Sequence, residues 1–126
     1  MKQISRHKND VVYVGSWVAR KHNKLRRQPH DIDIVVNSLD GLETFGEIKC
    51  FESKSVMSNG SKRCQIVSNE VKIDIWVRDE LPKWELIDGM KFQTLESQIQ
   101  HYKNILDLTD NMVMKKSVNE RLRILQ

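Results

Sequence analysis

The sequence predicts a single α+β domain in which helices pack on one side of a small mixed β-sheet. Two observations predict this class. Short β-branched runs separated by polar turns fill residues 11–78, which is typical of strands. Residues 79–126 place apolar side chains at helical spacing instead. Since 126 residues suit one domain, we expect a strand-rich core over residues 1–78 and C-terminal helices over residues 79–126.

The opening unit is predicted to be strand, helix, strand. Residues 11–14 form an apolar run that ends at Gly15 and Ser16, and the Ser16 hydroxyl is a competent N-cap for a helix over residues 17–25. Pro29 separates that helix from the β-branched run of residues 31–36, which predicts the second strand.

Three more strands and one short helix are expected before residue 78. We predict the helix over residues 39–45, ended by Gly46, and a strand over residues 47–51. A further strand is expected through residues 64–67. Residues 71–77 alternate most strictly, with Lys72 and Asp74 on the polar face.

The C-terminal part is predicted to be helical. Residues 82–88 are expected to make one or two helical turns, closed by Gly89. Thr94 is a plausible N-cap for an amphipathic helix, and a final helix follows it. The apolar rows of these two helices are Leu95, Ile99, Tyr102 and Leu106, and then Val118, Leu122 and Leu125.

The distribution of charge and the two cysteines indicate which ligands and which cellular compartment to expect. Residues 1–30 hold eight Lys and Arg but one acid, which suits a polyanionic ligand such as nucleic acid or a nucleotide triphosphate, or a basic face that keeps the protein soluble. No apolar run approaches the roughly 20 residues of a membrane span, and the first residues lack a signal-peptide core. Cys50 and Cys64 show no metal-ligand spacing, so we expect free thiols in a cytoplasmic protein.

Three carboxylates carry the chemistry that the sequence suggests. Asp31 and Asp33 lie two residues apart in a strand and therefore point to one face. If the strand of Asp74 lies beside theirs, the three acids converge. Such a set suits two hard divalent ions, Mg²⁺ or Mn²⁺, about 4 Å apart, as used for in-line displacement at phosphorus. The alternative interpretation is that each acid faces water at a strand edge.

Gly15 and Ser16 form a second candidate site. A glycine at the end of a strand lets the backbone approach a phosphate closely. The serine hydroxyl and the first N–H groups of the helix could then bind that phosphate. A plain strand-to-helix turn with a serine cap remains the alternative.

In combination, the blocks Tyr13–Arg20, His30–Val36 and Val71–Ile75 resemble the nucleotidyltransferase superfamily of DNA polymerase beta, and most of all the head domain of CCA-adding and poly(A) polymerases. The resemblance covers roughly the first 78 residues. It implies transfer of a nucleoside monophosphate from a nucleoside triphosphate (NTP) to a hydroxyl. Asp31 and Asp33 would hold both metal ions and Asp74 one of them, while Gly15 and Ser16 would hold the triphosphate.

The chain also departs from that family. Fourteen residues separate Ser16 from Asp31, and the Arg-Asp pair usual after the glycine motif is missing. Arg20 and Lys72 are therefore only candidate phosphate contacts. From the length of this sequence we expect no counterpart of the domains that choose the acceptor in those enzymes. A nucleic acid 3′ end is the favoured acceptor, a protein or small-molecule hydroxyl stays open, and a partner protein could supply specificity.

Two other functions remain open from the sequence. Asp33 followed by Glu47 and Lys49 has the layout of a PD-(D/E)xK nuclease, in which the lysine helps to orient a metal-activated water. The domain could also be a non-catalytic nucleotide- or nucleic-acid-binding module. Trp76, on the predicted face of Asp74, could stack on a base or pack beneath a helix.

Overall fold

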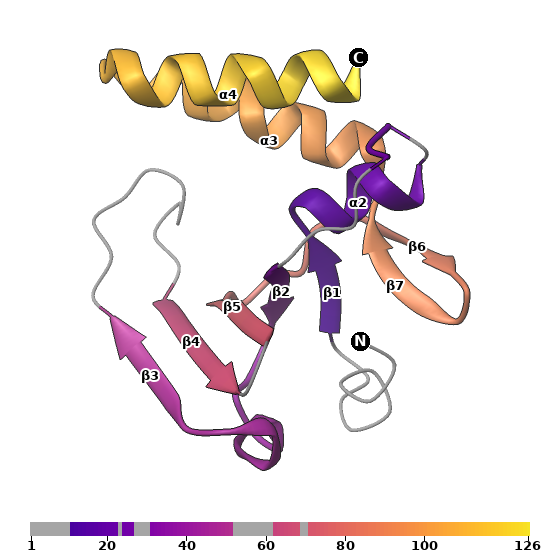
Figure 1. The fold of residues 1–126 in the computed structure, drawn as a ribbon, viewed down its shortest axis with the longest axis vertical. Coiled ribbons are helices and arrows are strands. Elements are labelled where there is room, and N and C mark those ends of the chain that lie inside the picture. Colours follow the sequence, from indigo (N-terminus) through magenta and orange to yellow (C-terminus); the bar gives the residue numbers. More distant parts are fainter. Residues whose placement is uncertain (1–10, 23, 27–30, 52–61, 69–70) are drawn as a thin grey trace.

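The structure, a computed structural model, describes residues 11–22, 24–26, 31–51, 62–68 and 71–126. Within these residues the chain is α+β, with one seven-stranded mixed sheet and helices (Figure 1). His30 and the basic residues of positions 1–10 and 27 lie outside the described residues. The strands are β1 (Val11–Val14), β2 (Asp31–Val36), β3 (Ile48–Phe51), β4 (Lys62–Ser68), β5 (Val71–Val77), β6 (Trp84–Ile87) and β7 (Met90–Gln93). The helices are α2 (Ser16–Lys21), the 3₁₀-helix η1 (Leu42–Phe45), α3 (Leu95–Leu108) and α4 (Met112–Leu125).

The strand order places the two carboxylate-bearing strands side by side. The sheet runs β3-β4-β5-β2-β1-β7-β6, with β2 and β5 parallel to each other at its centre. β1 pairs with β2 antiparallel and with β7 parallel. Because β2 and β5 are neighbours, Asp33 and Asp74 can lie close together, as the sequence analysis required.

The two sides of the sheet meet different helices. Apolar side chains of one side, such as Ile34 and Ile75, form a core with Val18 of α2 and Leu42 of η1. α3 and α4 form a second apolar cluster with Ala19 of α2, and they lie together at the top of Figure 1. Because residues of α3 and α4 share a pocket with side chains of the opposite side of the sheet, the prediction that all helices pack on one side is wrong.

The segment predicted as helical turns over residues 82–88 is a strand. β6 pairs antiparallel with β7, which the sequence analysis did not predict, and Asp88 and Gly89 join them with φ of 53° and 76°. Two consecutive residues with positive φ make the type of turn that matches the twist of a two-residue hairpin, and Asp-Gly is a favoured pair there. The Asp-Gly pair was therefore the missed signal.

Three smaller differences concern the helices around the first strands. α2 ends at Lys21 instead of residue 25, and its N-cap is Gly15, with Ser16 already in the helix. No side chain caps α2 by a hydrogen bond, so Ser16 is not the predicted cap. The helix expected over residues 39–45 is a 3₁₀-helix over residues 42–45. The predicted cap of α3 is confirmed, since the Thr94 hydroxyl accepts from the Ser97 N–H, and the apolar rows of α3 and α4 are confirmed as well, since both belong to one apolar cluster.

The prediction that the cysteines are free thiols is wrong in this structure. Cys50 of β3 and Cys64 of β4 are direct partners in the antiparallel register, and a disulfide joins them. Their Cα atoms lie 4.0 Å apart. Sequence spacing alone did not reveal that the two residues face each other across a strand pair.

The sequence predicted no membrane-spanning segment, and the helices of the structure can be compared with that prediction. Across the described residues, no helix combines the length and the apolar character that crossing a bilayer requires.

Candidate functional site

The register of β2 and β5 brings two of the three predicted carboxylates together. Asp33 is the direct partner of Asp74, and Asp31 is the partner of Lys72. The side chains of Asp33 and Asp74 are joined by a hydrogen bond. Asp31, at the start of β2, is exposed, although its charge still acts on Asp33. The site therefore contains the carboxyl pair of Asp33 and Asp74, with Asp31 beside it.

Asp33 is the electrostatically perturbed member of the pair. Burial, and then the charges of Asp74 and Asp31, raise the pKa of its carboxyl from 3.8 to about 7. The guanidinium of Arg121 opposes this shift. Near neutral pH the pair therefore holds a proton in the absence of a cation, as two close acids do when both cannot ionise together.

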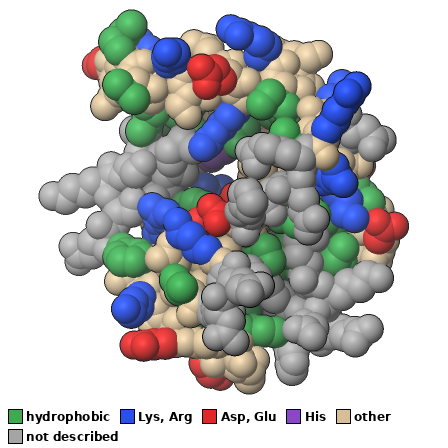
Figure 2. All heavy atoms as spheres, in the orientation of Figure 1, with side chains coloured by type: hydrophobic (Ala, Val, Ile, Leu, Met, Phe, Trp, Pro, Cys, Tyr) green, Lys and Arg blue, Asp and Glu red, His purple; other side chains and the backbone are tan. Residues whose placement is uncertain are grey.

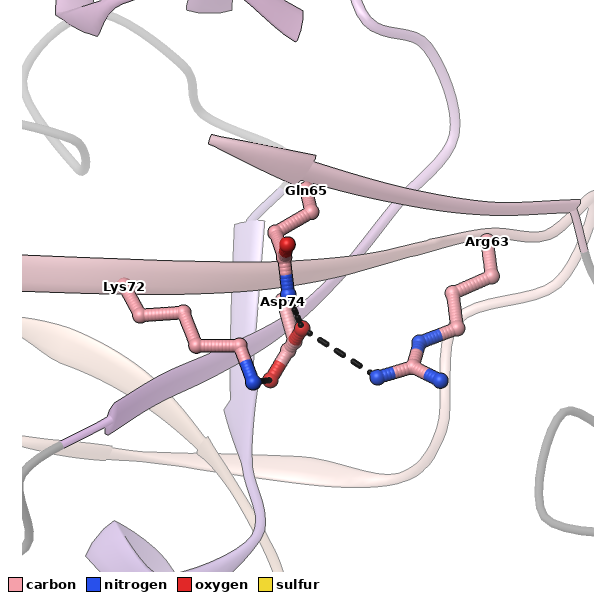
Figure 3. Close-up of polar contacts among 4 residues, drawn as sticks. All are labelled: Arg63, Gln65, Lys72 and Asp74. Atoms are coloured by element: carbon pink, nitrogen blue, oxygen red, sulfur yellow. Dashed lines mark hydrogen bonds and ion pairs between the residues drawn. The ribbon is translucent and has the colours of Figure 1, made fainter. Parts of the chain in front are cut away.

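Asp74 is held by three side chains of the sheet (Figure 3). Its Oδ1 accepts a hydrogen bond from Gln65 Nε2 at 2.9 Å and lies 3.4 Å from a guanidinium nitrogen of Arg63. Lys72 Nζ lies 3.9 Å from Oδ2. Asp74 as a whole residue is 5% exposed. These contacts fix the orientation of Asp74 and balance part of its charge without a bound ion.

Gly15 is the backbone element that closes over this pair. Its φ of 71° lies in the left-handed region. A Cβ at this position would stand 2.1 Å from Asp33 Oδ2, so no other residue fits without displacing that carboxyl. The strand-to-helix turn is therefore packed directly against the acid, as a site that brings backbone close to a ligand requires.

A pocket opens beside these residues, between the sheet and the helical pair α3–α4. Its lining includes Ser16 and Asp33 from the opening unit. From the other elements come Trp76, Arg78, His101, Tyr102 and Arg121. In Figure 2 basic side chains gather around the hollow between the helices at the top and the sheet below, with acidic side chains at its lower edge.

The helical wall of this pocket is polar and cationic. Burial, and then the charge of Arg78, lower the pKa of His101 to about 4, so His101 is neutral at physiological pH. The guanidinium of Arg121 lies 5.8 Å from the centre of the Tyr102 ring. Burial raises the pKa of the Tyr102 phenol, while Arg121 opposes that shift. A negatively charged ligand would therefore meet a positive wall opposite Asp33.

The remaining predicted contacts fall in different places. Ser16 is exposed and lines the pocket. Arg20 is exposed, donates to the Arg26 carbonyl oxygen and does not line the pocket, so its position gives no support for a phosphate contact. Lys72 contacts Asp74. Trp76 lines the pocket, and its indole Nε1 is buried with no hydrogen-bond partner among the described residues.

The residues of the nuclease hypothesis are spread across the sheet. Lys49 lies on β3, and β4 and β5 separate it from β2. Three strand spacings amount to about 14 Å between the backbones of Lys49 and Asp33. Glu47 precedes β3 and is exposed. This separation does not favour joint action of Asp33, Glu47 and Lys49 on one metal-bound water.

Whether the carboxylates suit a metal ion can be judged from their chemistry. Within the described ranges, no three His, Cys, Asp or Glu side chains are grouped so that they could hold a metal ion as they stand. The pair of Asp33 and Asp74, with Asp31 beside it, nevertheless offers the oxygen donors that Mg²⁺ and Mn²⁺ prefer. The proton that the pair holds marks a place where a cation would be stabilising, so the donor set fits.

The helical wall was not predicted from the sequence. On the sheet side, the alternation of residues 71–77 put Arg78 on the face of Asp74 and Trp76, but no role was assigned to it. His101, Tyr102 and Arg121 come from α3 and α4, and their helical spacing carries no sign of which sheet residues they face. Arg121 lies 88 positions after Asp33 and still acts on its pKa.

Comparisons with known proteins bear on the fold. No protein-family model matches the chain, and no curated protein matches it in sequence. Among solved structures, the chain is similar to the crystal structure of JHP933 from Helicobacter pylori, with a TM-score of 0.52 and 16% sequence identity. The match covers 74% of this chain and 47% of that one, so the chain spans about half the length of that protein. At this identity the likeness concerns the fold alone.

Proposed function

We propose that this protein is a nucleotidyltransferase that moves a nucleoside monophosphate from an NTP to an acceptor hydroxyl. The observation that carries the proposal is the hydrogen-bonded pair of Asp33 and Asp74 on neighbouring parallel strands, closed over by Gly15. The sequence resemblance to the DNA polymerase beta superfamily involves these same three positions.

Each residue has a role in the proposal. The turn at Gly15 and Ser16 binds the triphosphate through backbone N–H groups and the serine hydroxyl, since both line the pocket. Arg121 faces the same space and balances the negative charge of the nucleotide. The acceptor oxygen forms a bond to the α-phosphorus as the bond to pyrophosphate breaks, and pyrophosphate leaves. Asp33 would hold the cation that lowers the pKa of the acceptor hydroxyl, whose proton passes to water.

The proposal includes a divalent cation. Asp31, Asp33 and Asp74 are the residues that would hold Mg²⁺ or Mn²⁺, which supplies charge stabilisation at the reacting phosphate when bound. Arg63, Gln65 and Lys72 keep Asp74 in place before and after binding. The proposed acceptor is a nucleic acid 3′ end, and a protein or small-molecule hydroxyl is tested alongside it.

The test is label transfer. The protein is incubated with each α-labelled NTP, with Mg²⁺ or Mn²⁺, and with cellular RNA, DNA or protein. Label is expected to enter one acceptor fraction, whereas a γ-labelled NTP gives none. Asp33→Ala is expected to lower the rate by at least about 10³-fold, with the exposed Asp79→Ala as matched control. Asp74→Asn should lower the rate by about the same factor and spare NTP affinity, because in this proposal Asp74 contacts only the ion that activates the hydroxyl. Unchanged transfer by Asp33→Ala would exclude the assigned site.

One observation favours a second function, a nucleotide- or nucleic-acid-binding module without catalysis. Asp74 already has Arg63, Gln65 and Lys72 as partners, so its charge is partly balanced without a metal ion. Such a module binds nucleotide equally well with EDTA and with Mg²⁺ and transfers no label. Equilibrium binding of each NTP in both conditions therefore separates the two functions.

A further inference from the structure

One amide of α3 points away from the solvent and into the site. Gln98 is 2% exposed, which is unusual for glutamine, and it is one of four buried polar residues in the described part of the chain. Its Nε2 donates a hydrogen bond to the Gly15 carbonyl oxygen at 2.8 Å. Since a buried amide without a partner is destabilising, this bond explains how Gln98 is accommodated.

The acceptor of that bond is the turn that closes over Asp33. The Gly15 carbonyl oxygen also accepts the Val18 N–H of α2 at 3.1 Å. On its other side, Gly15 lies so close to the Asp33 carboxyl that a Cβ would stand 2.1 Å from Oδ2. One peptide group thus joins the end of β1, the start of α2 and the first turn of α3, directly beside the acid.

The anchoring of Gln98 itself is firm. Its backbone N–H donates to the Thr94 carbonyl oxygen at 3.0 Å, in the first turn of α3. The Thr94 hydroxyl caps that turn through the Ser97 N–H, and Ser97 Oγ accepts from Gln93 Nε2 of β7. The amide therefore extends from a helix start that is fixed to the sheet by its own hydrogen bonds.

We infer that Gln98 is a positioning residue that holds the Gly15–Ser16 turn against Asp33 and so sets the geometry between the phosphate-binding backbone and the carboxyl pair. The inference rests on the proposed function for its effect on rate. Its structural part stands independently of any reaction. Through Gln98, the C-terminal helical region controls a site whose acids all come from the sheet.

The test replaces the donor with a side chain of similar shape. Gln98→Met removes the hydrogen bond and keeps the volume, and Gln100→Met is the control, since Gln100 is exposed on the same helix and contacts Asn104. Without the bond the turn withdraws and Asp33 regains hydration. Amide hydrogen exchange at Ser16 and Val18, followed by ¹H–¹⁵N NMR, should then be about 10-fold faster than in the control, because the Val18 N–H donates to the same Gly15 carbonyl oxygen.

The kinetic readout separates positioning from stability. If the chain transfers label, kcat of Gln98→Met should fall about 10-fold, whereas KM for the NTP changes less than about 3-fold, because misplacement affects the reacting geometry most. The Gln100→Met control should match the wild type in both parameters. If no condition gives transfer, the proposed function fails and the NMR comparison still decides the inference.

Two results would overturn the inference. One is amide hydrogen exchange at Ser16 and Val18 that is as slow in Gln98→Met as in the Gln100→Met control. The other is loss of the folded state by circular dichroism in both Gln98→Met and the milder Gln98→Asn, with the control folded, which would assign Gln98 to stability alone.

Discussion

The sheet wall and the helical wall of the pocket differ in charge and in how their side chains are held. On the sheet wall, strand register makes Asp33 and Asp74 direct partners, and hydrogen bonds from neighbouring strands hold Asp74. On the helical wall, Arg121 and Tyr102 depend on the separate apolar cluster of α3 and α4. Backbone pairing thus fixes Asp33 and Asp74, whereas helix packing fixes the guanidinium of Arg121. We therefore expect changes to the sheet to alter the free energy of unfolding and changes to the helices to alter the pKa of Asp33.

The disulfide of the sheet gives the largest expected effect. Removing it with Cys50→Ser and Cys64→Ser together should lower the free energy of unfolding by about 3 kcal/mol, because the bridge closes a loop with a sequence separation of 14. Urea unfolding of the wild type, with and without reductant, measures the same quantity. The double variant should not respond to reductant.

If reductant does not change the free energy of unfolding, the sequence-based prediction of free thiols would be correct. This result consists of an unfolding curve that reductant leaves unchanged, together with two thiols that react after unfolding without reductant, since Cys64 is buried in the folded protein. The helical wall offers a second check, since the hydrogen exchange of α3 and α4 amides should be the same in both redox states.

The prediction of free thiols failed for the same reason that the helical wall was missed. Alternation along the chain predicted the β2 and β5 strands, because alternation is a local property. The common face of Asp33 and Asp74 required only one further condition, that β2 and β5 are neighbours. The residue of β4 that faces Cys50 of β3 depends on how the two strands pair across residues 52–61, and the sequence of those residues carries no periodic signal. The Gln98–Gly15 hydrogen bond spans 83 positions and is equally invisible to local patterns.

Some local signals were present and given the wrong meaning. Asp88-Gly89 was interpreted as the end of a helical segment, whereas its two positive φ angles turn β6 into β7. Gly15 was predicted to let backbone approach a phosphate. The structure adds that it must be glycine because Asp33 occupies the space of a side chain, and whether a phosphate binds there stays a prediction.

The second effect is a pH-dependent gain in stability from Asp33→Asn. The unfolded carboxyl titrates near 3.8 and the folded one near 7, so between these values the folded state holds a proton that the unfolded state has lost. Wild-type stability should therefore fall as pH rises through this window, by at most about 1.4 kcal/mol per pH unit. Asparagine mimics the protonated acid and avoids this loss.

The measurement is the free energy of unfolding of both proteins at pH 4 and pH 8, without divalent ions. Asp33→Asn should be more stable than the wild type by about 2 kcal/mol at pH 8 and nearly equal to it at pH 4. The exposed Asp79→Asn is the control and should show no such difference between the two pH values. An equal gain at both pH values would mean that packing, and not ionisation, separates Asp33 from asparagine.

The smallest effect concerns Arg121, the cation that the helical wall directs at the sheet. Its charge lowers the Asp33 pKa against burial and the two neighbouring acids. Arg121→Met keeps most of the side-chain volume and should raise the Asp33 titration midpoint by a few tenths of a pH unit, as expected for a charge acting across a partly hydrated pocket. Carboxyl ¹³C NMR measures it, with the exposed Arg123→Met on the same helix as control. Because Val118 and Leu122 supply the apolar packing of α4, and Arg121 adds only its contact with the Tyr102 ring, the free energy of unfolding should fall by less than about 1 kcal/mol. A midpoint equal to that of Arg123→Met would show that the helical wall does not act on the acids, and the charge comparison between the two walls would then fail.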